Sequence, residues 1–121
     1  MILVDTSVWA DHFRGNVVSL QRHLESGQVM VHPFIVGELA LGHLKDRAAV
    51  IEALHALPAA PRPRHAEVLL MVENAPLFGR GIGLIDAYLL ASAKLHENAR
   101  LWTRDRKLNG IAASMSLAFQ E

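Results

Sequence analysis

The chain has 121 residues, of which 51% are hydrophobic, and its 12 basic and 12 acidic side chains balance. This length suits one domain with its own core, and the apolar share excludes a disordered chain. The balanced charge does not by itself indicate a nucleic-acid partner. The lack of cysteine excludes disulfides, thiolate metal sites and a cysteine nucleophile. We expect a single domain over residues 1–121.

Membrane association and secretion are not expected either. No apolar run approaches the roughly 18 residues of a membrane-spanning helix. Asp5 follows the first apolar residues so closely that no signal-peptide core forms. The sequence therefore predicts a soluble, cytoplasmic protein.

The predicted elements alternate between short apolar strands and helices. Residues 2–4 are wholly apolar, which is typical of a central parallel strand covered on both faces. Thr6 or Ser7 is predicted as the N-cap of the next helix, which ends near Gly15. The further elements up to residue 75 are a helix at about 17–26, a strand at 29–31, and helices at about 33–42, 46–57 and 65–75.

The same alternation continues to the end of the chain. A helix is predicted at about 84–96, a strand at 101–103, a short helical segment after it, and a last strand at 115–119. This order favours an α/β layer fold with a mainly parallel sheet.

Three acidic residues stand in segments that otherwise resemble core. Asp5 is the only charged residue in residues 1–10. Among Asp, Glu, Lys and Arg, Glu38 is alone in residues 29–44, and Asp86 is alone in residues 81–93. An isolated carboxylate in an apolar segment is costly to bury unless another group compensates its charge.

The predicted topology brings these acids to one edge of the sheet. Asp5 and Asp105 follow strands, Glu38 lies early in the helix after the second strand, and Asp86 begins a helix, where the dipole favours negative charge. Ligand crevices of open parallel sheets lie beyond the carboxyl ends of the strands. Taken singly, each acid could be a cap, a turn residue or a rim residue. Their coincidence favours a shared site.

Four carboxylates in one crevice repel one another, so protons or cations must neutralise some of them. A set of oxygen ligands without cysteine or paired histidines indicates a hard divalent ion. We expect Mg²⁺, with Mn²⁺ as the alternative.

Four segments, in this order and at these separations, resemble the PIN-domain family, and most closely its VapC toxins. They are VDTSVW (4–9), ELALG (38–42), DAYLLASA (86–93) and TRDRKL (103–108). The resemblance implies a PIN-like α/β fold, with a mainly parallel central sheet of four to five strands flanked by helices. It places the catalytic, metal-binding acids of the family on Asp5, Glu38, Asp86 and Asp105. The supporting hydroxyl positions match Thr103 and, in the first segment, Thr6 or Ser7.

The resemblance further implies a Mg²⁺-dependent endoribonuclease, the toxin of a VapBC-type toxin–antitoxin pair. Its expected partners are RNA, a cognate antitoxin and a second copy of the chain in a homodimer, or a hetero-oligomer with the antitoxin. Cationic side chains near the acidic edge are candidates for holding RNA phosphates. They are Arg14, Arg80, Arg104, Arg106 and Lys107.

Two other functions stay open at this point. Another metal-dependent phosphoryl hydrolase, such as a phosphatase, would need an aspartate two residues after Asp5, where Ser7 stands. The second open function is that of a PIN-like RNA-binding or RNA-processing module that is not a toxin. In its non-catalytic form it would be expected to lack one of the four acids, and all four are present.

Overall fold

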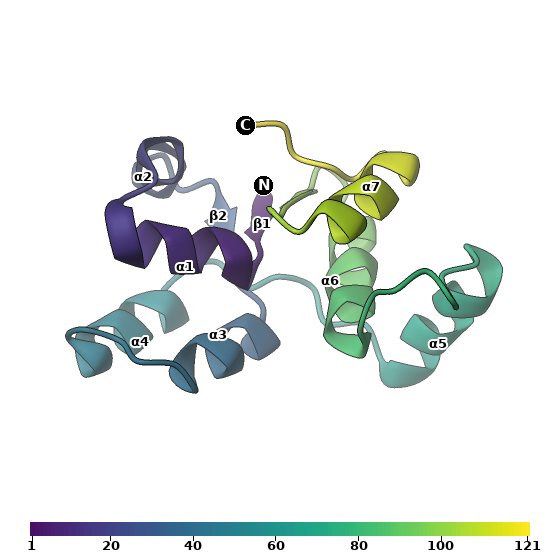
Figure 1. The fold of residues 1–121 in the computed structure, drawn as a ribbon, viewed down its shortest axis with the longest axis horizontal. Helices are drawn as coiled ribbons and strands as arrows, with labels where there is room; N and C mark the ends of the chain where they lie inside the picture. The colour runs from purple at the N-terminus through teal and green to yellow at the C-terminus, as the bar shows by residue number, and fades with distance from the viewer.

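The computed structural model describes residues 1–121 as a short parallel sheet surrounded by helices (Figure 1). Strand β1 (Ile2–Val4) is central and pairs in parallel with β2 (Val29–Met30) on one side and β3 (Arg100–Trp102) on the other. The helices are α1 (Thr6–Gly15), α2 (Val18–Glu25), α3 (Pro33–Ala40), α4 (Arg47–His55), α5 (His65–Asn74), α6 (Leu84–Leu95) and α7 (Arg106–Ser114). None of them has both the length and the apolar character needed to cross a bilayer.

Each outer strand of the sheet carries one further parallel bridge. Val31, just after β2, pairs with Ala59, and Leu101 of β3 pairs with Ala118. The predicted α/β class, with a parallel sheet flanked by helices, is confirmed. Three strands, extended by one bridged residue at each edge, stand where four to five strands were expected.

The strand predicted at 115–119 is wrong over most of its length. Met115 is the C-cap of α7, and Ser116 has a φ of 59°, which is a left-handed turn conformation. Only around Ala118 does the chain pair with Leu101, through two backbone hydrogen bonds of 2.7 and 2.9 Å. The turn uses up the residues that a longer strand would need.

The start of α1 also differs from the prediction of Thr6 or Ser7 as its N-cap. The N-cap is Asp5, whose backbone is still extended (φ −73°, ψ 158°), and α1 begins at Thr6. The N–H of Asp5 donates to the Trp102 carbonyl at 2.9 Å, while its own carbonyl accepts the N–H of Trp9 at 3.2 Å. Asp5 therefore ends the sheet and starts the helix without a loop, so its position is fixed from both sides.

The core is one cluster of 29 buried apolar residues built around β1. Leu3 and Val4 are fully buried, as expected for a central parallel strand. Helices α1 to α4 lie on one side of β1 and α5 to α7 on the other (Figure 1). Trp9 is 3% exposed and stacks on Phe13, with 5.7 Å between ring centroids, so it packs in the core and is not available to stack on a base.

Replacing Leu101 by alanine should lower the free energy of unfolding by about 2–5 kcal/mol, because the side chain is fully buried in the sheet. Leu70→Ala is the control, since Leu70 is 61% exposed, and we expect a change within about 0.5 kcal/mol. Urea denaturation of both variants measures the difference. Equal stabilities would contradict the placement of Leu101 at the centre of the core.

Candidate functional site

Asp5 lies at the carboxyl end of β1 and is 6% exposed. Although it occupies the N-cap position of α1, its side chain accepts no backbone N–H there. Its Oδ2 accepts hydrogen bonds from Ser7 Oγ at 2.9 Å and Thr103 Oγ1 at 2.7 Å, and its Oδ1 accepts a long one from Thr6 Oγ1 at 3.3 Å. Hydroxyl donors stabilise a buried carboxylate but leave its negative charge in place.

The same hydroxyls fasten the loop after β3 to Asp5. Ser7 Oγ accepts the N–H of Arg104 at 3.0 Å, and Thr103 Oγ1 accepts the N–H of Asp105 at 3.1 Å. The two hydroxyl oxygens lie 3.4 Å apart. The start of α1 and the β3–α7 loop therefore form one hydrogen-bonded unit around a single carboxylate oxygen.

Asp86 and Asp105 each hold a helix terminus with one oxygen. Asp86, in the first turn of α6, accepts the N–H of Gly83 on Oδ2 at 3.2 Å. Asp105 is the N-cap of α7 and accepts the N–H of Leu108 on Oδ1 at 3.0 Å. Both acids thus accept a backbone N–H at the N-terminus of a helix, which is a structural role. Because each uses only one oxygen for it, the other oxygen remains available to a ligand.

The charges of these aspartates also affect the pKa of Glu38 of α3 or of one another. Burial raises the pKa of Glu38, and the charges of Asp5 and Asp86 raise it further. Burial also raises the pKa of Asp86, the Gly83 N–H lowers it, and the charges of Asp5 and Asp105 raise it. Each of the four predicted acids is therefore close enough to at least one other for their charges to interact, with Asp86 interacting with the other three.

No basic side chain compensates this cluster, because every ion pair in the molecule lies elsewhere. Uncompensated carboxylates at one edge of the sheet fit a divalent cation. No three of them converge closely enough to ligate one ion as they stand. An ion here would take one or two carboxylates directly and complete its shell with water, as Mg²⁺ commonly does.

Two of the predicted phosphate-binding arginines are occupied by acidic partners. Arg104 pairs with Asp11 of α1 at 2.8 Å and with Glu121 at 2.5 Å, and Arg14 also pairs with Asp11. The spacing of Asp11 and Arg14 along α1 predicts their contact. Nothing in the sequence links Asp11 or Glu121 to Arg104, and sequence reasoning missed both residues.

The other three predicted cations are exposed and form no ion pair. They are Arg80, Arg106 and Lys107. Lys107 lies over Gly81, where an added Cβ would stand 3.1 Å from its Nζ. Because Gly81 precedes α6 by three residues, Lys107 is close to the segment that carries Asp86.

A parallel α/β sheet whose carboxyl edge gathers carboxylates without basic partners is compatible with a metal-dependent phosphoryl hydrolase. Comparisons with known proteins narrow this class. The model of the PIN domain family matches residues 2–114. Ribonuclease VapC32 of Mycobacterium tuberculosis, in strains CDC 1551 and H37Rv, is 44% identical over 121 residues, which span this whole chain and 98% of that protein.

A solved structure agrees with the fold. The crystal structure of PAE2754 from Pyrobaculum aerophilum matches with a TM-score of 0.60 at 20% identity, over 91% of this chain and 78% of that one. The chain therefore belongs to the PIN-domain family, and within it to the VapC-type ribonucleases.

The raised pKa values make the metal-free protein sensitive to pH. A carboxyl whose folded-state pKa is raised binds more protons in the folded than in the unfolded protein. Ionisation of Glu38 and Asp86 should therefore lower the free energy of unfolding as pH rises from about 4 through their raised pKa values.

Asp86→Asn should stabilise the metal-free protein at pH 7 by about 0.5–2 kcal/mol, because the amide keeps an acceptor for Gly83 and removes the repulsion. The gain should shrink as pH falls toward 4, and Mg²⁺ should stabilise the variant less than the parent. Thermal melts with EDTA and with Mg²⁺ measure both effects.

Glu73→Gln is the matched control, because Glu73 is exposed and forms no ion pair. It should change neither the stability nor its pH dependence by much. An Asp86→Asn protein that melts like the parent in both buffers would leave Asp86 with no role beyond holding the helix terminus.

Proposed function

We propose that this protein is the toxin of a toxin–antitoxin pair and cleaves RNA with Mg²⁺ bound at the carboxylates of Asp5, Glu38, Asp86 and Asp105. As a VapC-type PIN protein it is an endoribonuclease that depends on a divalent metal. The observation that carries the choice of site is a chain of four carboxylates whose neighbouring members repel one another and that have no basic partner. Mn²⁺ can take the place of Mg²⁺ at this site. Residues 1–121 act as one PIN domain in the cytoplasm.

The anchored carboxylates leave distinct oxygens for the ion. Oδ2 of Asp5 accepts two hydroxyl hydrogen bonds and Oδ1 only the long one from Thr6, so Oδ1 would be its ligand atom. Oδ1 of Asp86 and Oδ2 of Asp105 are likewise the oxygens not used at a helix terminus. The side chain of Glu38 accepts no hydrogen bond, and it would contact the ion directly or through water. When bound, such an ion would supply the Lewis acidity that makes a water molecule nucleophilic enough to attack a phosphodiester near neutral pH.

The remaining residues orient the site and the substrate. Ser7 and Thr103 fix the Asp5 carboxylate, so that its geometry does not depend on the ion. The three exposed, unpaired cations bind phosphates on either side of the cleaved bond. They are Arg80, Arg106 and Lys107.

Metal dependence is the decisive test. The purified protein should cleave structured RNA in Mg²⁺ or Mn²⁺ and stop in EDTA. Asp5→Asn should lower the rate by about two orders of magnitude or more, because it weakens a metal ligand while keeping the side-chain shape. Glu97→Gln, a charge change at an exposed residue without an ion pair, should cleave like the parent. Full cleavage in EDTA would overturn the proposal.

The antitoxin should block the site by inserting a basic side chain, an arginine by preference, among the carboxylates. The uncompensated charge of the cluster favours such a guanidinium. Asp5→Asn and Asp86→Asn should weaken the complex and reduce its dependence on salt. Calorimetric titration at two ionic strengths measures this. Unchanged affinity and salt dependence in both variants would indicate inhibition from elsewhere.

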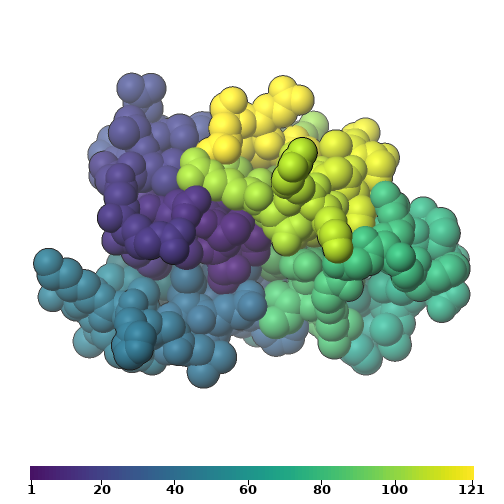
Figure 2. All heavy atoms as spheres, in the orientation of Figure 1, coloured from purple at the N-terminus to yellow at the C-terminus, as the bar shows by residue number.

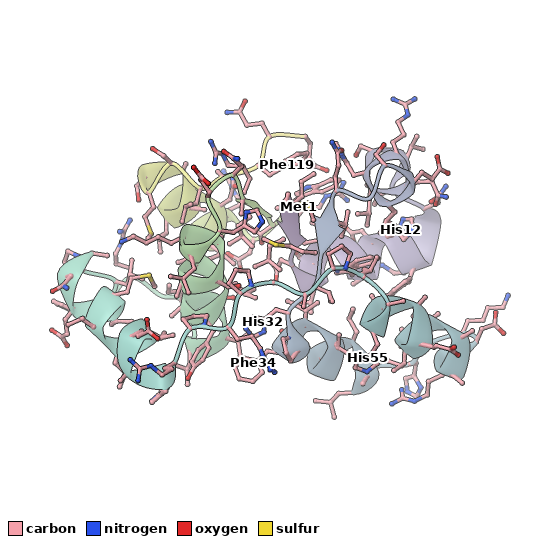
Figure 3. All side chains as sticks on the ribbon, turned by 180° about the vertical axis from the view of Figure 1, so that it is seen from behind. Met1, His12, His32, Phe34, His55 and Phe119 are labelled. Carbon is pink, nitrogen blue, oxygen red and sulfur yellow. The ribbon has the colours of Figure 1, made fainter.

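A homodimer through α3 fits the exposed apolar side chains. Phe34 and Leu41 are 41% and 91% exposed, and their spacing of seven residues puts them on one side of the helix with Glu38 between them. Phe34 lies at the molecular surface where α3 begins (Figure 3). Neighbouring exposed apolar side chains mark an interface. Such a dimer would bring two acidic clusters close together.

Leu41→Asp should therefore weaken dimerisation by about tenfold or more, since it puts a charge in the apolar contact. Leu70→Asp, on α5, should leave the dimer intact. Sedimentation velocity at micromolar protein measures the dimer fraction of each variant. A monomeric parent would refute the dimer.

A further inference from the structure

The backbone of Arg104 is connected to Asp5 of the acidic cluster by two hydrogen bonds through the Ser7 hydroxyl. Its N–H donates to Ser7 Oγ at 3.0 Å, and the Ser7 hydroxyl donates to Asp5 at 2.9 Å. Its chain neighbours Thr103 and Asp105 are both part of the site. The backbone from which the Arg104 side chain extends is therefore held by hydrogen bonds to the same groups that hold Asp5.

The guanidinium of Arg104, in contrast, is turned toward two carboxylates outside the cluster. Nη1 donates to Asp11 Oδ2 at 2.8 Å, and Nη2 and Nε donate to one oxygen of Glu121 at 2.5 and 3.2 Å. Figure 2 shows the yellow-green segment near residue 104 at the surface between purple α1 and the yellow C-terminal segment. Two segments, α1 and the C-terminal residues, thus hold the side chain of one arginine.

These ion pairs are too exposed to contribute much to stability. The side chains of Arg104, Asp11 and Glu121 are 34%, 32% and 44% exposed. Water screens the charges of such pairs, and holding two long side chains in one geometry costs conformational entropy. A phosphodiester offers acceptors that a guanidinium can bind in the same forked way as a carboxylate, and the backbone of Arg104 is connected to Asp5 through Ser7.

We propose that Asp11 and Glu121 are positioning residues that hold Arg104 at the rim of the site until an RNA phosphate replaces them as its partner. This inference rests on the proposed function. The two acids keep the guanidinium out of the acidic cluster in the free protein, and they compete with the substrate for it. Removing Glu121 should therefore tighten RNA binding, and only while Arg104 is present.

The experiment measures binding of a fluorescein-labelled single-stranded RNA by anisotropy in EDTA, so that no cleavage occurs. Glu121→Gln should lower the dissociation constant by about two- to fivefold, the range expected for an exposed ion pair. Arg104→Gln should raise it. In the double variant, the gain from Glu121→Gln should disappear, which is the coupling that a double-mutant cycle detects.

Glu97→Gln provides the matched control, since it removes the same charge from an exposed residue outside the site. If Glu121→Gln tightens binding no more than Glu97→Gln does, or tightens it equally without Arg104, the proposal is wrong. If the parent cleaves RNA with Mg²⁺ but the double-mutant cycle shows no coupling, only the positioning role of Asp11 and Glu121 is overturned. If the parent neither binds nor cleaves RNA, both this role and the proposed function are overturned.

Discussion

The structure depends on the burial of one charged side chain, Asp5, at the end of the central strand. Its backbone closes the sheet and opens α1 without an intervening loop, so the carboxylate cannot move away from the carboxyl edge. Hydroxyls from Ser7 and Thr103 make this burial tolerable without supplying a countercharge. The fold thus preserves a negative charge at a defined point, which is what a metal site requires.

The neighbouring acids are positioned by local helix geometry. Asp86 and Asp105 stand at helix N-termini, where a carboxylate is stabilised by free N–H groups, and one oxygen of each satisfies that role. The structural and chemical functions of these residues are therefore compatible. Glu38 lacks such an anchor, and its raised pKa reflects both burial and the repulsion it experiences.

Much of this arrangement could be predicted from the sequence, because isolated charges in apolar segments and the strand–helix alternation are local signals. Asp5, Glu38 and Asp86 were identified as such isolated charges, Asp105 by its place after a predicted strand, and the parallel sheet from the alternation. The last strand could not be placed, since the turn at Ser116 depends on backbone conformation and has no distinct residue pattern. The partners of Arg104 were also out of reach, because Asp11 and Glu121 meet it only through the tertiary fold.

The unequal treatment of the two oxygens of Asp5 has a consequence for the choice between ions. An oxygen that already accepts two hydroxyl hydrogen bonds is a poor ligand, so an ion at the proposed site would take Asp5 through Oδ1 alone, which accepts only the long hydrogen bond from Thr6. Calcium fills its larger shell of six to eight oxygens partly with bidentate carboxylates. Mg²⁺ keeps an octahedral shell rich in water and needs single oxygens. At the proposed site, the hydroxyl groups of Ser7 and Thr103 would therefore favour the smaller ion over calcium.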